Sequence, residues 1–193
     1  MRVIAFSDIH NDWHALRSIV RQESDIYICA GDLTYSERGL ETAAEILLPV
    51  REVLFIVPGN NELPDHLREY FPHVVHGQAQ TYRGLRIGGI GGSPRTPWNT
   101  LFEWDEDYAY TILRKLGETD IFVAHAPPKG TKLARTLSGD DAGSEAVRWY
   151  IEEYQPEYAI VGHVHERAGI TEKIGDTTVL NPGIRGMVFE ISP

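Results

Sequence analysis

Cysteine, basic side chains and long apolar runs are the scarce features of this sequence. Cys29 is the only cysteine, which excludes an intrachain disulfide and a cysteine-based zinc site. Lys and Arg number 18 against 28 Asp and Glu, so the formal net charge is −10. This balance opposes tight, sequence-independent binding to a long polyanion, so we expect no extended nucleic acid as a partner. A small phosphorylated substrate fits the balance better.

The sequence also lacks the segments that direct a chain to a membrane. No apolar run approaches membrane-spanning length, and residues 1–8 predict a strand rather than a secretory signal. We therefore expect no membrane partner and a cytoplasmic location. The 193 residues are enough for one domain with a substantial core, so we expect 1–193 to be a single domain. The sequence carries no signal for an oligomeric state.

Strand-like runs alternate with helical patterns in the first half of the chain. Runs of β-branched and aromatic residues predict strands at 2–7, 25–30, 52–57, 84–90, 120–124, 158–161, 168–174, 177–180 and 187–191. Periodic segments predict helices at 13–21, 36–49, 63–70, 105–116 and 144–154. The strands at the C-terminal end follow one another without helices, which predicts a second sheet, mixed or antiparallel. The stretch 88–99 is rich in Gly and Pro and is expected to be a loop.

Polar clusters end five of the predicted strands. They are Asp8-Ile9-His10, Gly31-Asp32, Gly59-Asn60-Asn61-Glu62, His125 and Gly162-His163-Val164-His165. Catalytic groups gather where parallel strands end, so the clusters predict one site assembled from the whole chain. Carboxylates, imidazoles and an amide suit a pair of divalent cations better than an organic cofactor. In extended segments, Asp8 and His10 would point to one side, as would His163 and His165.

Each cluster taken alone has an ordinary structural explanation, such as a solvated loop pair or a turn asparagine. In their order along the chain, however, they resemble the calcineurin-like metallophosphoesterase superfamily. Its pattern is Asp-x-His, Gly-Asp, Gly-Asn-His-Asp/Glu, His and Gly-His-x-His, and the match spans residues 8–165. The resemblance implies an α/β fold, a four-layer α/β/β/α sandwich of two facing mixed sheets.

The resemblance also implies a ligand set for two metal ions. One ion would be bound by Asp8, His10, Asp32 and His165, and the other by Asp32, Asn60, His125 and His163. Asp32 would then bridge the two ions. The resemblance favours Mn²⁺, while Fe, Zn²⁺ or Ni²⁺ would also suit these donors.

The expected activity is hydrolysis of phosphate esters by metal-activated hydroxide, with small phosphodiesters, nucleotides among them, as the favoured substrates. The catalytic residues would be Asp32, Asn61 and His125. Asn61 stands where the family pattern has a histidine that resembles a leaving-group acid, and an amide cannot deliver a proton at accessible pH. We therefore expect phosphodiesters or activated esters to be preferred over alkyl monoesters. A binding or scaffold protein that keeps the fold without turnover, or a nuclease, is the alternative.

Several further residues are candidates for contact with substrate. They are Asn61, Arg95, Trp98, Asn99 and Arg185. Segment 98–110 is a candidate cover for the site, although an acidic helix is more often a solvated face. Another histidine could replace the missing proton donor. The candidates are His14, His66, His73 and His76, and none of them belongs to a motif.

Overall fold

The computed structural model describes residues 1–193 and contains two main sheets. The first sheet has the strand order β12-β1-β2-β3. Its members are β1 (Arg2–Phe6), β2 (Ile26–Cys29), β3 (Leu54–Ile56) and β12 (Met187–Glu190). β1, β2 and β3 run parallel, and β12 pairs antiparallel with β1.

The second sheet has six strands in the order β10-β11-β9-β8-β5-β4. They are β4 (Ala79–Tyr82), β5 (Leu85–Ile90), β8 (Ile121–Ala124), β9 (Tyr158–Ile160), β10 (Ile170–Ile174) and β11 (Thr177–Asn181). The four inner strands are parallel, and β4 and β10 pair antiparallel at the two edges. A short parallel pair closes the loop that follows β5. It consists of β6 (Ser93–Pro94) and β7 (Glu103–Trp104).

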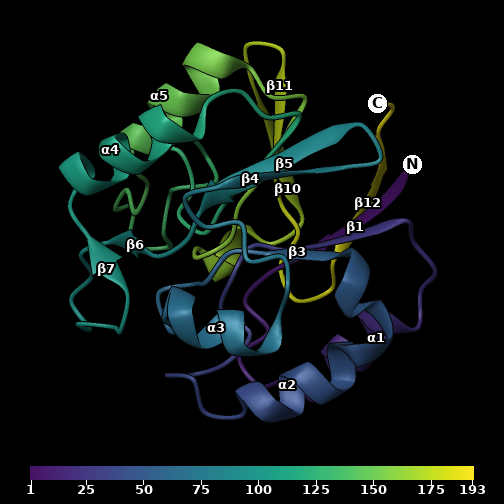
Figure 1. Cartoon of the computed structure of the whole chain (residues 1–193). Helices are drawn as coiled ribbons and strands as arrows, with labels where there is room; N and C mark the ends of the chain where they lie inside the picture. Colours follow the sequence, from purple (N-terminus) through teal and green to yellow (C-terminus); the bar gives the residue numbers. More distant parts are fainter.

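Helices cover the outer faces of both sheets (Figure 1). The first sheet is covered by α1 (Trp13–Val20), α2 (Leu40–Leu47) and α3 (Pro64–Tyr70), and the second by α4 (Glu106–Leu116) and α5 (Glu145–Tyr154). Side chains of Asp12, Asp105 and Ser144 cap the first turns of α1, α4 and α5. Two 3₁₀ helices, η1 (Leu48–Val53) and η2 (His165–Arg167), complete the chain. These four layers confirm the predicted α/β/β/α sandwich.

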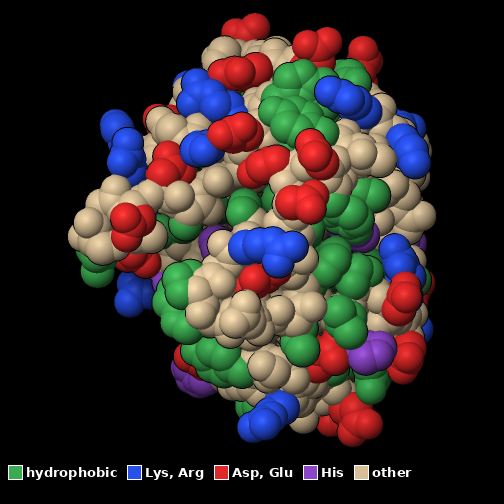
Figure 2. Space-filling view, turned by 90° about the vertical axis from the view of Figure 1, so that its left-hand side faces the viewer, with side chains coloured by type: hydrophobic (Ala, Val, Ile, Leu, Met, Phe, Trp, Pro, Cys, Tyr) green, Lys and Arg blue, Asp and Glu red, His purple; other side chains and the backbone are tan.

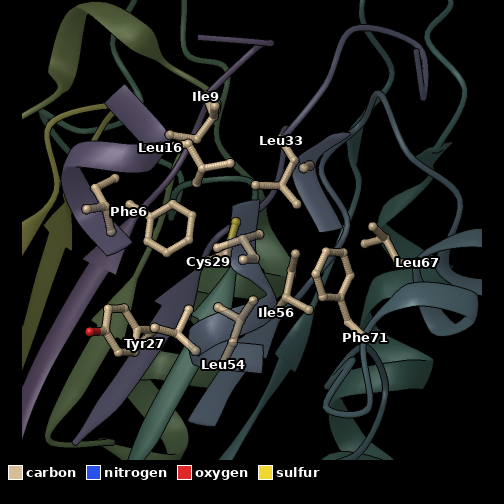
Figure 3. Packing of buried hydrophobic residues seen from close by; sticks show 14 of the residues in the cluster. Phe6, Ile9, Leu16, Tyr27, Cys29, Leu33, Leu54, Ile56, Leu67 and Phe71 are labelled. Atoms are coloured by element: carbon tan, nitrogen blue, oxygen red, sulfur yellow. The ribbon is translucent and has the colours of Figure 1, made fainter. Parts of the chain in front are cut away.

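Alternation along the strands builds the core on both sides of each sheet. In β1, Val3 faces the second sheet, while Phe6 packs under the helices of the first sheet. Figure 3 shows the latter cluster, in which Cys29 lies between aliphatic and aromatic side chains. The thiol is fully buried, as expected of a small hydrophobic residue.

Several predicted elements differ from the structure. The helix expected at 36–49 begins only at Leu40, because Ser36, Glu37 and Gly39 have positive φ, and it continues into η1. Strand β4 was not predicted; it lies at a sheet edge with partly exposed residues, so no apolar run marks it. The expected loop at 88–99 starts after β5.

The C-terminal strands do not form a sheet of their own. β10 and β11 extend a sheet whose interior is β9, β8 and β5, while β12 returns to the first sheet. Local strand spacing predicts a hairpin, but it cannot predict which sheet each strand joins.

Both sheets bring the ends of their parallel strands to one side of the molecule. β1, β2 and β3 of the first sheet and β8 and β9 of the second each end next to a predicted polar cluster. No helix in the fold is long and apolar enough to cross a bilayer.

Candidate metal centre and cleft

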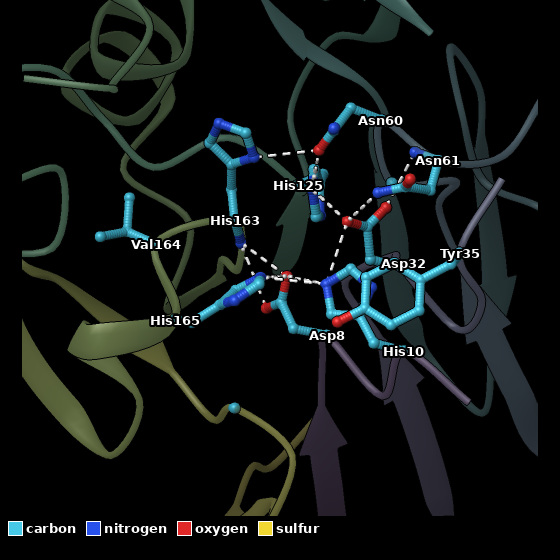
Figure 4. A network of polar contacts seen from close by, with 12 residues as sticks. Asp8, His10, Asp32, Tyr35, Asn60, Asn61, His125, His163, Val164 and His165 are labelled. Carbon is cyan, nitrogen blue, oxygen red and sulfur yellow. Dashed lines mark hydrogen bonds and ion pairs between the residues drawn. The ribbon is translucent and has the colours of Figure 1, made fainter. Parts of the chain in front are cut away.

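The fold brings all seven predicted metal ligands into one cluster (Figure 4). They come from the segments that follow five strands and form two groups of donor atoms. The groups are Asp8, His10, Asp32 and His165, and Asp32, Asn60, His125 and His163.

The first group gathers around the imidazole of His10. Its Nε2 lies 3.0 Å from Nε2 of His165 and 3.4 Å from Oδ2 of Asp32. Oδ1 of Asp8 lies 3.4 Å from Nε2 of His165 and 4.0 Å from Nε2 of His10. Nitrogen and oxygen donors thus face a common point.

The second group gathers around the amide oxygen of Asn60. This Oδ1 lies 2.9 Å from Nε2 of His125 and 3.0 Å from Nδ1 of His163. Oδ2 of Asp32 lies 3.6 Å from Nε2 of His125, and the same atom faces His10 in the first group. Asp32 therefore belongs to both groups.

The donor chemistry and spacing fit divalent cations. Donor atoms bound at right angles to one ion lie about 3 Å apart, which is the spacing of the closest pairs here. Nδ1 of His125 contacts the carbonyl oxygen of Ala30 at 2.7 Å. A proton on Nδ1 leaves the lone pair of Nε2 directed at Asp32 and Asn60, as a metal ligand requires.

The backbone at the ligands is not extended. Asp8, His10, Asp32 and His163 have φ of 54°, 45°, 54° and 69°. The prediction that Asp8 and His10, or His163 and His165, point to one side of an extended segment is therefore wrong. Asp8 and His10 still face each other, with Oδ1 and Nε2 4.0 Å apart, whereas His163 contacts Asn60 and His165 contacts His10. Left-handed backbone is uncommon outside glycine, and such strain concentrates at functional sites.

Two glycines leave room for the carboxylates. A Cβ at Gly59 would lie 1.8 Å from Oδ1 of Asp32, and a Cβ at Gly162 would lie 2.7 Å from Oδ2 of Asp8. The close approach of backbone and carboxylate explains why the clusters at β3 and β9 contain glycine.

Burial disfavours two carboxylate charges in this cluster. Burial and the neighbouring charge of Asp8 raise the pKa of Asp32 to about 7. Burial also lowers the pKa of His10 to about 4 and that of His163 to about 3, so both imidazoles are neutral near pH 7. Neutral imidazoles beside carboxylates form a cluster that a cation stabilises.

Asn61 and Glu62 support the ligands from behind. Asn61 donates to both oxygens of Asp32. The buried carboxylate of Glu62 accepts hydrogen bonds from the backbone N–H groups of Asp32, Thr34 and Gly59. Glu62 thus joins the segments that follow β2 and β3.

Comparison with known proteins agrees with this geometry. A family model described as calcineurin-like phosphoesterase matches residues 1–167. The chain belongs to the calcineurin-like phosphoesterase family. It is therefore a metal-dependent phosphoesterase, and divalent metal ions are the cofactors of the family.

Individual relatives resemble the chain over most of its length. The chain is 31% identical to an uncharacterized protein of Methanocaldococcus jannaschii, over 94% of this chain and 88% of the relative. A solved protein of Thermus thermophilus has a TM-score of 0.75 at 23% identity, covering 95% of this chain and 90% of the other. A dimetal phosphatase of Danio rerio has a TM-score of 0.56 at 12% identity, covering 95% and 88%. At these identities the two structures bear on the fold alone.

A cleft of about 850 Å³ opens at the candidate metal ligands of this phosphoesterase. Its lining includes His10, Asp32, Asn60, His163 and His165 at the base. Among the predicted substrate contacts, Asn61, Arg95 and Trp98 line the cleft, and Asn99 and Arg185 are not part of the lining. Arg185 is exposed in the turn before β12.

Sequence reasoning missed part of the cleft wall. Tyr35, Thr100, residues 136–138 and 140–143, and Glu166 line it as well. No motif marks these residues; their place depends on loops that meet only in the folded chain. None of the four alternative histidines lines the cleft. His66 faces Glu37, His73 contacts Gln80, and His76 accepts a hydrogen bond from Gly91.

Proposed function

We propose that this phosphoesterase hydrolyses small phosphodiesters, nucleotides among them, with two divalent metal ions, Mn²⁺ preferred. The observation that carries the proposal is the position of Oδ2 of Asp32, which faces His10 in one donor group and His125 in the other. A carboxylate placed in this way can bridge two cations. When bound, the ions supply charge neutralisation at phosphorus and lower the pKa of water.

The chain's own residues would hold the two ions and orient the leaving group. Asp8, His10 and His165 complete one donor group, and Asn60, His125 and His163 complete the other. Asn61 lines the cleft next to Asp32, where its amide can donate to a departing oxygen but cannot protonate it. Leaving groups that are stable as anions therefore suit this site best.

The charge of the cleft supports a diester over a monoester. Arg95 is the only Lys or Arg in the lining, whereas Asp140, Asp141 and Glu166 add negative charge near the mouth. A phosphodiester carries one negative charge and a phosphomonoester close to two at neutral pH. Fewer charges on the substrate mean less repulsion from these carboxylates.

The surface supports a small substrate rather than a long nucleic acid. On the face shown in Figure 2, Lys and Arg side chains form separate spots among acidic ones, without a continuous basic patch. The net charge of −10 also opposes binding of a long nucleic acid.

Hydrolysis of bis(p-nitrophenyl) phosphate in the presence of Mn²⁺ tests the proposal. We expect turnover by the wild type, and a loss of at least a hundredfold in Asp32→Asn and His125→Ala. Both variants should remain folded by circular dichroism. A wild type that binds Mn²⁺ but turns over no ester across Mn²⁺, Zn²⁺, Mg²⁺, Ni²⁺ and Fe²⁺ would support the scaffold alternative instead. The same series run with p-nitrophenyl phosphate measures the preference for a diester over a monoester.

A further inference from the structure

Three large apolar or aromatic side chains are exposed at the mouth of the cleft. Trp98 is 78% exposed, Leu137 84% and Tyr35 56%, and all three line the cleft. We call them the rim residues. Each comes from a different loop: Tyr35 from the loop after β2, Trp98 from the loop between β6 and β7, and Leu137 from the loop between β8 and α5. Exposed apolar groups gathered around a polar centre mark a ligand-binding surface.

The Trp98 loop is tied to a metal ligand. Oε1 of Glu103 accepts from the hydroxyls of Thr96 and Thr100, at 2.5 Å and 2.6 Å. The side-chain amide of Asn60 in turn donates to Oγ1 of Thr100 at 2.9 Å. Trp98 is held between these threonines, with its N–H 3.2 Å from Oγ1 of Thr96.

The Leu137 loop is tied to the segment that follows His165, a member of the other donor group. The N–H of Leu137 donates to Oε1 of Glu166 at 2.7 Å, and Glu166 directly follows the ligand His165. The guanidinium of Arg167 donates to the carbonyl oxygens of Arg135 and Thr136. The segment after His165 thus fixes the backbone at Leu137 and at the two residues before it.

Tyr35 contacts a ligand directly. Its ring stacks on the imidazole of His10, with ring centroids 4.3 Å apart and an interplanar angle of 19° (Figure 4). Its backbone N–H donates to Oδ1 of Asn11. Every rim residue is therefore positioned relative to a different metal ligand, His10, Asn60 or His165.

We propose that the rim residues bind an uncharged aromatic group carried by an ester substituent of the phosphate, so that the substrates are phosphodiesters bearing an aryl or nucleobase-like group. This inference rests on the proposed function, because the phosphate itself would lie at the metal centre. Flat aromatic surfaces stack on Trp and Tyr and pack against Leu. A second phosphate would face Asp140, Asp141 and Glu166 with only Arg95 to pair with, so polyphosphates are disfavoured.

Binding of two non-hydrolysable anions tests the rim separately from turnover. Diphenylphosphinate and dimethylphosphinate each carry one negative charge, but only diphenylphosphinate has aromatic groups. With Mn²⁺ present, titration calorimetry should give at least tenfold tighter binding of diphenylphosphinate to the wild type. Trp98→Ala and Leu137→Ala should each weaken diphenylphosphinate binding about fivefold or more, as removal of a stacking or packing side chain does, and leave dimethylphosphinate within about twofold.

Leu101→Ala and Leu48→Ala are matched controls, because both leucines are exposed, at 47% and 61%, and neither lines the cleft. They should change neither affinity. Equal affinity of the wild type for the two phosphinates, or an unchanged ratio in both rim variants, would overturn the inference. If bis(p-nitrophenyl) phosphate is turned over without this selectivity, the rim inference alone fails. Selective binding without turnover of any ester would instead reject the proposed function.

Discussion

Asn61 donates two hydrogen bonds to Asp32, one from its backbone N–H to Oδ1 at 3.0 Å and one from its side-chain amide to Oδ2 at 2.8 Å. Asn61, which replaces the histidine of the family pattern, is therefore hydrogen-bonded to the carboxylate of Asp32, which both donor groups share. Asn61 positions Asp32, and this role does not require a proton donor.

Replacing Asn61 with histidine should change leaving-group selectivity. An imidazole at this position can protonate a departing alkoxide, and a general acid typically contributes about 10² to 10⁴ in rate. We expect Asn61→His to increase kcat for an alkyl phosphodiester relative to kcat for bis(p-nitrophenyl) phosphate by about tenfold or more. The comparison uses the ratio of the two kcat values, because loss of the hydrogen bond from the Asn61 side-chain amide to Asp32 lowers both of them. Asn61→Ala, which also loses that hydrogen bond, is the control and should leave the ratio unchanged. If Asn61→His also left the ratio unchanged, the missing-acid explanation would be contradicted.

Gly162→Ala should displace Asp8. The new Cβ would lie 2.7 Å from Oδ2 of Asp8 and 3.0 Å from Cβ of Ser7, so the carboxylate must move. Asp8 belongs to the first donor group and also clusters with Asp32 and His125, so we expect the affinity for Mn²⁺ to fall at least tenfold, with a matching loss of phosphoesterase activity. Titration calorimetry measures the affinity and thermal unfolding checks the fold. Unchanged affinity for both ions would show that Asp8 is not a ligand.

The carboxylate of Glu103 should stabilise the protein in a pH-dependent way. Burial alone would raise its pKa, but hydrogen bonds from Thr100 and Thr96 outweigh burial and lower the pKa to about 2. Since the folded pKa lies below the usual 4.5, the stabilisation is complete above about pH 4.5 and is lost as the pH falls toward 2. Glu103→Gln should lower Tm by about 2 to 4 °C at pH 7, for a loss of about 1 kcal/mol. In a pH series of Tm values, this difference should shrink steadily below pH 4.5; a constant difference would contradict the role of the charge.

Asp140→Asn should relax discrimination against multiply charged substrates. Asp140 is an exposed carboxylate at the cleft wall, so its removal reduces repulsion of a second negative charge. We expect kcat/KM for p-nitrophenyl phosphate to rise about twofold to fivefold relative to bis(p-nitrophenyl) phosphate at low ionic strength, and the gain to shrink in about 0.5 M salt. Asp107→Asn, on the exposed side of α4, is the control and should have no effect. A gain that persists at high salt would indicate a cause other than charge.

The sequence predicts which side chains meet at the candidate metal centre, because each combines a chemically distinctive group with a position just after an apolar run. His125 directly follows β8, and Asp32 follows β2 after Ala30 and Gly31. The orientation of these side chains is not predictable in the same way. Asp8 and His163 have left-handed φ, and the backbone N–H of His163 lies within hydrogen-bond distance of both carboxylate oxygens of Asp8, a contact between two sheets that exists only once they are packed.

The rim illustrates what the sequence leaves undetermined. Trp98 is a candidate because an unusual Gly- and Pro-rich stretch precedes it, whereas Tyr35 and Leu137 belong to ordinary loops. Leu137 reaches the cleft because Glu166, far along the chain, binds its backbone N–H. Arg185 has a phosphate-binding side chain after a strand, yet the turn that carries it lies outside the cleft lining. Which loop residues reach the cleft therefore depends on tertiary contacts.

The number of metal ions bound per chain tests the central claim most directly. Free Mn²⁺ measured by electron paramagnetic resonance during titration should reveal two sites in the wild type. His125→Ala should retain no more than one tight site, because the donor group of Asn60, His125 and His163 is then incomplete, and Asp32→Asn should weaken both. A wild type that binds fewer than two ions, or a His125→Ala variant that still binds two with unchanged affinity, would contradict the two-metal centre.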